Sequence, residues 1–305
     1  MNIRVLKALS LSALLVAVTM WVIFSVATNT AFASAGQSIL LTATVTAQLP
    51  PMTTTPITVG DDFPIYKVQF VSRDDSLNIR SGPGAQYPIV ATAYNGDELQ
   101  GLGMTKSSDG SIWVPVQRLY PDPKLSGWVN RQFAVPQVDP SVYCADPNAR
   151  AVVDEVIEAV RTEDGDRLAK IITPVRGLYI MGVYWGQVVQ FSKKQVRNFF
   201  TDSTVYSWAP DGYGADVTGP LSEVIIPLLK NDLLAKEMTV GCGGSQEVSG
   251  VYFSPRYDMN SLPYYTTFRP GNYGHEFDWG AWAFGIDYWE GVPSLSYLYY
   301  DYWTP

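Results

Sequence analysis

The chain has 305 residues, of which 47% are hydrophobic and 16% charged, and its formal net charge is −8. This composition can form folded cores and excludes a chain that is disordered throughout. The acidic balance excludes nucleic acid as an expected partner, because such binding needs a basic face. A length of this order is typical of about two domains.

The first 35 residues have the pattern of an export signal. Arg4 and Lys7 supply a short positive start, and residues 8–27 form an apolar run without a charge. Small residues that end at Ala35 then offer cleavage sites, which completes the order of a secretory signal peptide. The apolar run is also long enough to cross a bilayer as an uncleaved anchor, the chain's expected membrane contact in that case. We favour cleavage, and either alternative places the rest of the chain outside the cytoplasm.

Residues 36–64 have the composition of a linker. They are rich in Thr and Pro and carry almost no charge before Asp61 and Asp62. Such a stretch cannot bury a core, and its prolines keep it extended. We interpret it as a spacer between the export signal and the folded part.

The next part of the chain, residues 65–136, shows short alternating runs and no amphipathic helix. Their number and spacing predict a small β-barrel. The runs are Tyr66–Ser72, Ser76–Arg80, Ile89–Tyr94, Glu98–Met104, Ile112–Val116 and Gly127–Asn130. The dipeptide Asn95-Gly96 predicts a hairpin between the third and fourth runs.

Several motifs in this part resemble the bacterial SH3 domain, SH3b. They are LNIRSGPGAQYPIV at residues 77–90, Asn95-Gly96, Trp113 and the closing Gly127-Trp128-Val129. The resemblance implies a compact SH3-like barrel in an extracytoplasmic protein. It also implies a targeting module, since many such domains bind peptidoglycan or peptides.

On the SH3b surface, we expect a ligand groove near the Ser81–Gly84 turn. Tyr87, Trp113 and Trp128 are the aromatic residues expected to line this groove or to lie beneath it. At least one tryptophan is expected to be buried, because so small a barrel needs large side chains in its core.

Two cysteines, Cys144 and Cys242, are far apart in the sequence. In an oxidising compartment such a pair favours a structural disulfide, and two separate buried thiols are the alternative.

Residues 139–305 combine helices with later strands and predict an α+β domain with an antiparallel sheet. Val152, Val156 and Val160 lie on one face of a predicted helix that starts at Asp146-Pro147. Further helices are expected after caps at Asp166 and Ser192, and over Leu221–Lys236 with a disturbance at Pro227. Strands are expected at Thr204–Trp208, Gly250–Ser254, Pro263–Phe268, Trp279–Trp289 and Ser294–Trp303, with a hairpin turn at Glu290-Gly291.

The order of these elements is similar to that of uncharacterised secreted bacterial proteins and, more loosely, of NTF2-like folds. It rests on the helix pair, the stretches GLYIMGVYWG and TVYSW, and the aromatic terminal hairpin. The resemblance implies a helix pair beside a curved sheet and implies no activity.

Residue counts exclude several catalytic classes. His275 is the only histidine, and zinc hydrolases need two or more. Neither cysteine lies in a nucleophile motif, and GCGGS lacks the lysine of a phosphate loop. The run from His275 to Asp278 would place alternate residues on opposite sides of an extended segment, so we favour a polar loop over a metal site. We expect no cofactor and no metal.

Glycoside hydrolysis needs only two carboxylates, so this alternative stays open. Spacing selects no pair among the candidates, which are Glu223, Glu247, Asp258, Glu276, Asp278 and Asp287. We favour an acidic surface.

The last strand carries Tyr297 and Tyr299 on one face and Tyr300 and Tyr302 on the other. One face must pack on the helices. The second face is either a sugar- or peptide-binding surface or is covered as well, and we favour a sheet covered on both sides.

The sequence therefore predicts a non-catalytic, extracytoplasmic binding protein, secreted or anchored at the cell envelope, whose SH3b module targets cell-wall peptide or glycan. The alternatives are a cell-wall polysaccharide hydrolase that uses carboxylates of the C-terminal domain, and a membrane-anchored interaction partner with a purely structural SH3b.

Overall fold

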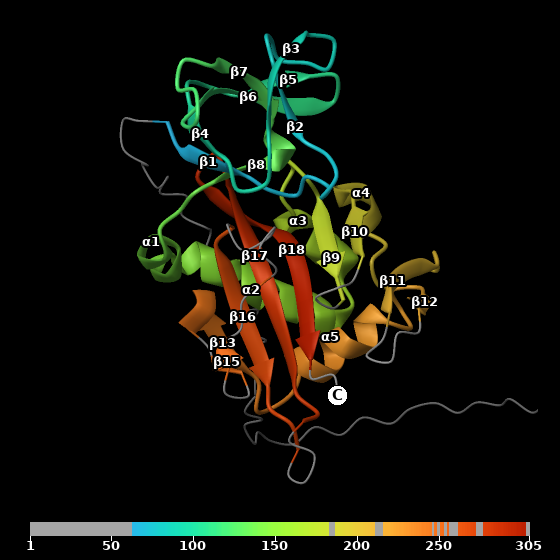
Figure 1. Ribbon diagram of the computed structural model, residues 1–305. Helices are drawn as coiled ribbons and strands as arrows, with labels where there is room; N and C mark the ends of the chain where they lie inside the picture. Colours follow the sequence, from blue (N-terminus) through green and yellow to red (C-terminus); the bar gives the residue numbers. More distant parts are fainter. Residues whose placement is uncertain are drawn as a thin grey trace, which may run out of the picture. The chain divides into compact units, whose positions relative to one another are not determined.

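The computed structural model describes residues 63–182, 187–210, 216–245, 247–248, 251–252, 255, 262–272 and 277–302. All of them belong to one compact unit, which spans Pro50–Pro305. Within this unit, an SH3-like barrel is followed by an α+β region, as expected from the sequence (Figure 1).

The barrel is one antiparallel sheet with the strand order β3-β2-β7-β6-β4-β1-β8, and β5 pairs with β6. Its elements are β1 (Ile65–Val68), β2 (Leu77–Arg80), β3 (Ile89–Ala93), β4 (Glu98–Gly101), β5 (Lys106–Ser108), β6 (Ser111–Arg118), β7 (Ser126–Asn130), the 3-10 helix η1 (Arg131–Phe133) and β8 (Ala134–Pro136). Inward-facing residues such as Ile79, Val114 and Val129 are fully buried. Their neighbours along the strands are half-buried, apart from the buried Trp113 on β6, which is close to the pattern of a sheet with one covered face.

The hairpin predicted at Asn95-Gly96 is wrong, because β3 pairs with β2 whereas β4 pairs with β1 and β6. The turn itself forms, with Gly96 at a φ of 94°. Its polar groups bond to the chain before β2: Gly96 N donates to Val68 O, and the Asn95 side chain bonds to both backbone groups of Val71. The Asn95-Gly96 turn therefore holds the segment that follows β1 in place, and it does not join two paired strands.

The α+β region contains a six-stranded sheet in the order β10-β9-β18-β17-β16-β13. Its strands are β9 (Leu178–Met181), β10 (Val188–Phe191), β13 (Thr239–Cys242), β16 (Tyr264–Arg269), β17 (Gly280–Trp289) and β18 (Val292–Tyr302). The sheet was expected to be antiparallel, but it is mixed, because β9 runs parallel to β18. Two short hairpins accompany it, β11 (Tyr206–Pro210) with β12 (Asp216–Gly219) and β14 (Glu247–Val248) with β15 (Val251–Tyr252).

The helices are α1 (Pro140–Ala145), α2 (Pro147–Thr162), α3 (Gly165–Ile171), α4 (Lys193–Val196) and α5 (Ile225–Leu233). Helix α2 lies across one face of β17 and β18 (Figure 1), with its apolar face buried. Asp146 caps α2 and Ser192 caps α4, as expected.

Two details of the helix predictions are wrong. Asp164, not Asp166, caps α3, because its carboxylate accepts the Arg167 N–H while Asp166 already lies inside the first turn. Pro227 does not disturb α5, because it lies in the first turn, where no intrahelical hydrogen bond from its nitrogen is needed.

The β17–β18 hairpin forms as predicted, with Glu290 and Gly291 at φ values of 51° and 79°. Tyr297 and Tyr299 are fully buried on one face, and Tyr300 is 5% exposed on the other. The prediction of a sheet covered on both sides is confirmed.

A buried ion cluster joins the barrel to the α+β region. Asp287, on β17, is fully buried, and its carboxylate lies 3.0 Å from Arg131 Nη2 and 2.8 Å from Arg176 Nη1. Thr173 Oγ1 donates a third hydrogen bond, of 3.3 Å. Burial alone would raise the pKa of Asp287, but the two arginine charges hold it below its ordinary value. Asp287 therefore remains charged and balances arginines from both parts of the unit.

Neighbouring contacts cross the same boundary. Arg176 Nε donates to Gln132 O at 2.9 Å, and Gln132 Nε2 donates to Tyr179 OH at 2.9 Å. The Phe70 ring stacks on Tyr179 at 4.9 Å between centroids. The ion cluster thus lies within a larger area of polar and aromatic packing.

Replacing Asp287 by Asn should destabilise the protein by about 3–5 kcal/mol, because two buried guanidinium groups would lose their counter-charge. Urea unfolding measures the change. The matched control is Asp154→Asn, which breaks the exposed Arg150–Asp154 pair and should cost less than about 1 kcal/mol. Equal effects of the two substitutions would contradict the structural role of the cluster.

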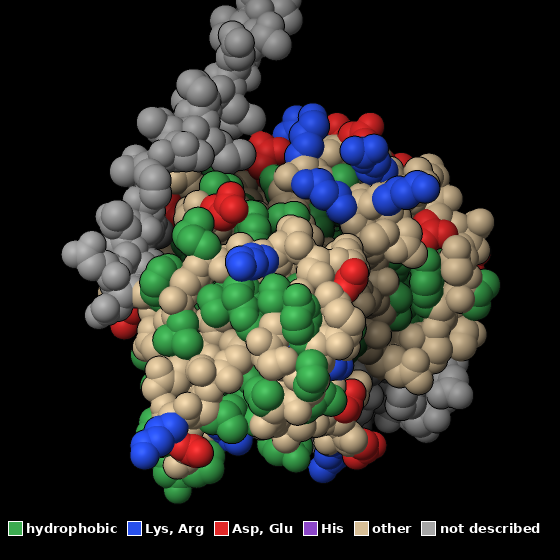
Figure 2. Space-filling view, turned by 90° about the horizontal axis from the view of Figure 1, so that it is seen from above, with side chains coloured by type: hydrophobic (Ala, Val, Ile, Leu, Met, Phe, Trp, Pro, Cys, Tyr) green, Lys and Arg blue, Asp and Glu red, His purple; other side chains and the backbone are tan. Residues whose placement is uncertain are grey.

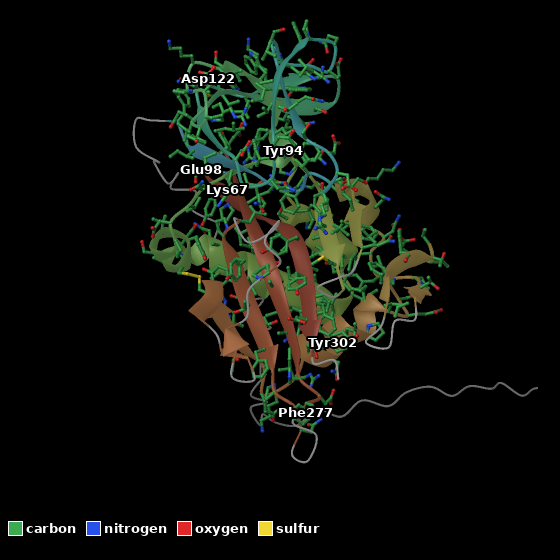
Figure 3. All side chains as sticks on the ribbon, in the orientation of Figure 1. Lys67, Tyr94, Glu98, Asp122, Phe277 and Tyr302 are labelled. Carbon is green, nitrogen blue, oxygen red and sulfur yellow. A yellow bond between two sulfur atoms is a disulfide. The ribbon has the colours of Figure 1, made fainter. Side chains whose placement is uncertain are left out.

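Asp301, next to Tyr302 at the end of β18 (Figure 3), should lower stability at neutral pH. Burial raises the pKa of its carboxyl from 3.8 to about 6. The folded state therefore holds this proton more tightly than the unfolded state does. The free energy of unfolding falls as the pH rises from 3.8 to about 6. Asp301→Asn should raise the urea midpoint above pH 6 and have little effect below pH 3.8. Asp122→Asn, at an exposed aspartate, is the matched control.

The structure joins Cys144 of α1 to Cys242 of β13 by a disulfide, with the two Cα atoms 5.8 Å apart. Replacing both cysteines by serine should lower the free energy of unfolding by about 4–5 kcal/mol, since the bridge closes a long loop. Wild-type protein in reducing agent should behave like the double variant. Two thiols that react with an alkylating reagent in unreduced, denatured protein would rule out the bridge.

Candidate functional site

The outer face of β2, β5, β6 and β7 carries a continuous set of aromatic and polar side chains, which we call the outer strip. Its members are Asn78, Arg80, Lys106, Trp113, Pro115, Trp128 and Asn130. In the register of the sheet, Trp128 lies opposite both Arg80 and Pro115, and Trp113 lies opposite Asn130 and Lys106. Such cross-strand partners share a face. The outer strip is therefore one surface, separated from the core by the sheet.

Trp113 lies at the wall of a pocket of about 240 Å³. The pocket combines aromatic side chains with amides, hydroxyls and one charge of each sign; its other lining residues are Phe70, Val71, Ser72, Asp75, Ser76, Leu77, Asn78, Arg80, Asn130 and Phe133. Trp113 itself is 6% exposed. Its Nε1 is buried and has no hydrogen-bond partner in the described part of the chain. The pocket thus offers an apolar wall with hydrogen-bonding groups at its rim.

The far wall of this pocket is held in place by the Asn95-Gly96 turn. The Asn95 side chain accepts from Val71 N at 3.1 Å and donates to Val71 O at 2.6 Å. Phe70, the preceding residue, has a φ of 64°, a conformation that costs a non-glycine residue energy unless its surroundings enforce it. Two contacts fix the Phe70 side chain. Its ring stacks on Tyr179, and the Arg176 guanidinium lies 5.1 Å from the centroid of the Phe70 ring.

Tyr87 lies beside the outer strip and does not line the Trp113 pocket. Its ring packs on Gly82, where a Cβ atom would approach the ring to 2.4 Å, so the Ser81–Gly84 turn needs glycine at this position. The Tyr87 carbonyl accepts from Arg80 Nη1 at 2.8 Å. Tyr87 therefore braces the turn and positions an arginine of the strip, while 39% of it remains exposed.

Trp128 is half-buried, and Lys106 Nζ lies 5.3 Å from the centroid of its ring. The structure thus places Trp113 and Trp128 on one surface, with Tyr87 adjacent to it. Sequence reasoning missed Phe70 and Phe133, which reach the pocket through tertiary packing. It also missed Asn78 and Asn130, although their alternation with the buried Ile79 and Val129 was a readable signal.

The barrel surface also exposes scattered apolar side chains, among them Ile89, Val90, Tyr94 and Tyr120. Figure 2, seen from above, shows hydrophobic side chains gathered near the middle of that face. Lys67 and Glu98 lie opposite one another on β1 and β4 (Figure 3). Single exposed apolar residues are normal on protein surfaces, and these four line neither the Trp113 pocket nor the outer strip.

Three of the six candidate catalytic carboxyls have side chains in the described part of the chain. Asp287 is committed to the ion cluster. Asp278 is 62% exposed and lies 3.6 Å from Arg269, whereas Glu223 is exposed in the turn before α5. These settings do not bring a general acid and a general base together.

Several predictions fall outside the described residues, namely the apolar run 8–27, nearly all of the linker, His275, Glu276 and Asp258, as does the side chain of Glu247. Within the described ranges, no group of three or more His, Cys, Asp or Glu residues is arranged to hold a metal ion. None of the described helices has the length and apolar character that crossing a membrane requires.

The fold and the outer strip define a small SH3-like barrel with a pocket beside one face of its sheet. Residues 75–134 match the family model of the bacterial SH3 domain, and this part of the chain is such a domain. Bacterial SH3 domains are often cell-wall binding modules and occur in extracytoplasmic proteins.

A comparison with curated proteins finds no match for the chain. Among solved structures, the chain is similar to a structure from Xanthomonas campestris described as a calcium/calmodulin dependent protein kinase II association domain. The identity is 14%, the match covers 50% of this chain and 84% of that chain, and the TM-score is 0.22. A likeness this weak supports no conclusion, and the resemblance of the later residues to NTF2-like folds stays a prediction.

Proposed function

We infer that the protein is a non-catalytic, extracytoplasmic binding protein whose SH3b domain binds cell-wall peptide or glycan through the outer strip. The observation that carries this inference is the pocket at Trp113, where aromatic walls meet the amides of Asn78 and Asn130. The export-signal pattern of the first 35 residues supports the setting.

The chemistry of the strip suits such a ligand. Indole rings can stack on the apolar faces of sugars and on peptide bonds, and their N–H groups need a partner when buried. Amide side chains both donate and accept hydrogen bonds, as peptide and acetamido groups require. Lys106 and Arg80 add positive charge beside Trp128, which favours the carboxylates of wall peptides.

The alternative, a wall hydrolase that uses C-terminal carboxylates, has less support. The two arginines that bind Asp287 hold its pKa below the ordinary value. The general acid of a carboxylate pair needs the opposite, a raised pKa, so Asp287 is not suited to that role.

Retention on purified, insoluble peptidoglycan tests the inference. Wild-type protein should be retained, and Trp128→Ala should weaken retention about tenfold, equivalent to about 1.4 kcal/mol, because a stacking surface is lost. Tyr120→Ala is the matched control, since Tyr120 is an aromatic residue that is 81% exposed and lies outside the strip.

Each other result has a defined meaning. Failure of the wild-type protein to be retained would remove the targeting role. Equal retention of Trp128→Ala and wild type would remove the outer strip as the binding surface. A clearing band in a zymogram that disappears in Asp278→Ala or Glu223→Ala would support the hydrolase instead.

A further inference from the structure

A second pocket, of about 590 Å³, lies between the barrel and the tip of the β17–β18 hairpin. We call it the junction pocket. Its walls include Phe63 and Tyr66 from the start of the barrel, Met104 from the loop after β4, Arg131 from η1 and Trp289 from the hairpin. It shares no lining residue with the Trp113 pocket. Its volume is in the range typical of sites for small organic ligands.

The outer part of the junction pocket is apolar and accessible. Met104 is 80% exposed and Phe63 is 44% exposed, while Trp289 is half-buried. Exposed apolar side chains that converge on one hollow mark an interaction site more often than scattered ones do. Methionine is also suited to such a rim, because its flexible thioether adapts to ligands of different shape.

The wall of the junction pocket includes one basic residue, Arg131, which belongs to the buried ion cluster behind it. Arg131 and Arg176 share the single carboxylate of Asp287, so the cluster of these three side chains has a net charge of +1. A buried charge of this kind favours the arrival of an anion.

Arg131 is the member of the cluster that reaches the pocket. It is 2% exposed, and its guanidinium lies 5.3 Å from the centroid of the Tyr66 ring, which also lines the pocket. The one acidic residue in the wall, Glu290, lies in the exposed hairpin turn, where water screens its charge. Tyr288, also in the wall, donates its hydroxyl proton to Asp146 at 3.0 Å. Both Nη atoms of Arg131 already donate within the protein, to Ala134 O, Asp287 and Tyr288 O, so the net charge of the cluster is what favours a ligand carboxylate at this end.

We propose that the junction pocket binds a small organic acid in which a carboxylate is joined to an aromatic or branched apolar group. The carboxylate lies towards Arg131 and the apolar group lies against Met104 and Phe63. This site is independent of the outer strip and of the ligand proposed for it.

Nuclear magnetic resonance with labelled methionine methyl groups tests the proposal on the mature, oxidised chain. The probe is N-acetyl-L-phenylalanine, and N-acetyl-L-phenylalaninamide is the matched neutral compound. The acid should shift the methyl signal of Met104, which Met104→Ala identifies by its loss. The amide should bind at least tenfold more weakly, because it lacks the charge that Arg131 recognises.

Two variants with the same change in net charge locate the site. Met104→Glu should weaken binding of the acid at least tenfold, because it places a carboxylate at the apolar rim. Tyr120→Glu, at a surface position outside the pocket, should leave binding unchanged. Trp128→Ala should also leave it unchanged, which separates this site from the outer strip.

Three results would overturn the proposal. They are an unshifted Met104 signal at millimolar acid, equal binding of acid and amide, and equal effects of Met104→Glu and Tyr120→Glu. Neither Met104→Glu nor Tyr120→Glu replaces a residue of the ion cluster, and the urea midpoint of each variant checks that it is folded.

Discussion

The carboxylate of Asp287 has no access to water, and the guanidinium groups of Arg131 and Arg176 balance its charge. One arginine comes from the end of the barrel and the other from the loop before β9, so a single buried acid determines how two sheets meet. Both arginines also donate to backbone carbonyls, those of Ala134 and Gln132. A buried ion pair is costly to break by removing one partner, so loss of any one member of the cluster should weaken the junction.

The junction in turn positions both candidate binding surfaces. Phe70 lines the Trp113 pocket with its side chain and lies 5.1 Å from the Arg176 guanidinium, whereas Arg131 lines the junction pocket. The left-handed backbone at Phe70 persists because Tyr179, Arg176 and the neighbouring Asn95 clamp all hold this segment. The conformation of the barrel loop thus depends on residues far along the chain, which an isolated barrel would lack.

Local patterns predicted much of this architecture. Alternation located the barrel strands, and the Glu290-Gly291 turn predicted the terminal hairpin because both of its strands are adjacent in sequence. The same kind of signal failed at Asn95-Gly96, where bonds to Val68 and Val71 replaced the hairpin. The SH3b motif drew attention to Trp113 and Trp128, whose part in binding stays a prediction. Asp287 was considered only as a candidate catalytic acid, since nothing in the sequence indicates that its partner lies 156 residues away.

The disulfide has a consequence for how the junction would behave if its ions separated. Helix α1 begins a few residues after β8, the last barrel strand, and Cys144 ties this helix to Cys242 on the edge strand β13. The barrel would therefore remain attached beside the six-stranded sheet by a short connection. The facing surfaces of the barrel and the sheet would keep a high effective concentration relative to each other. Re-formation of the Arg131–Asp287 pair would be an intramolecular search over a short distance. In an oxidising environment the disulfide adds a covalent link to the packing of Tyr143 on Tyr265, which holds α1 on the sheet in either redox state.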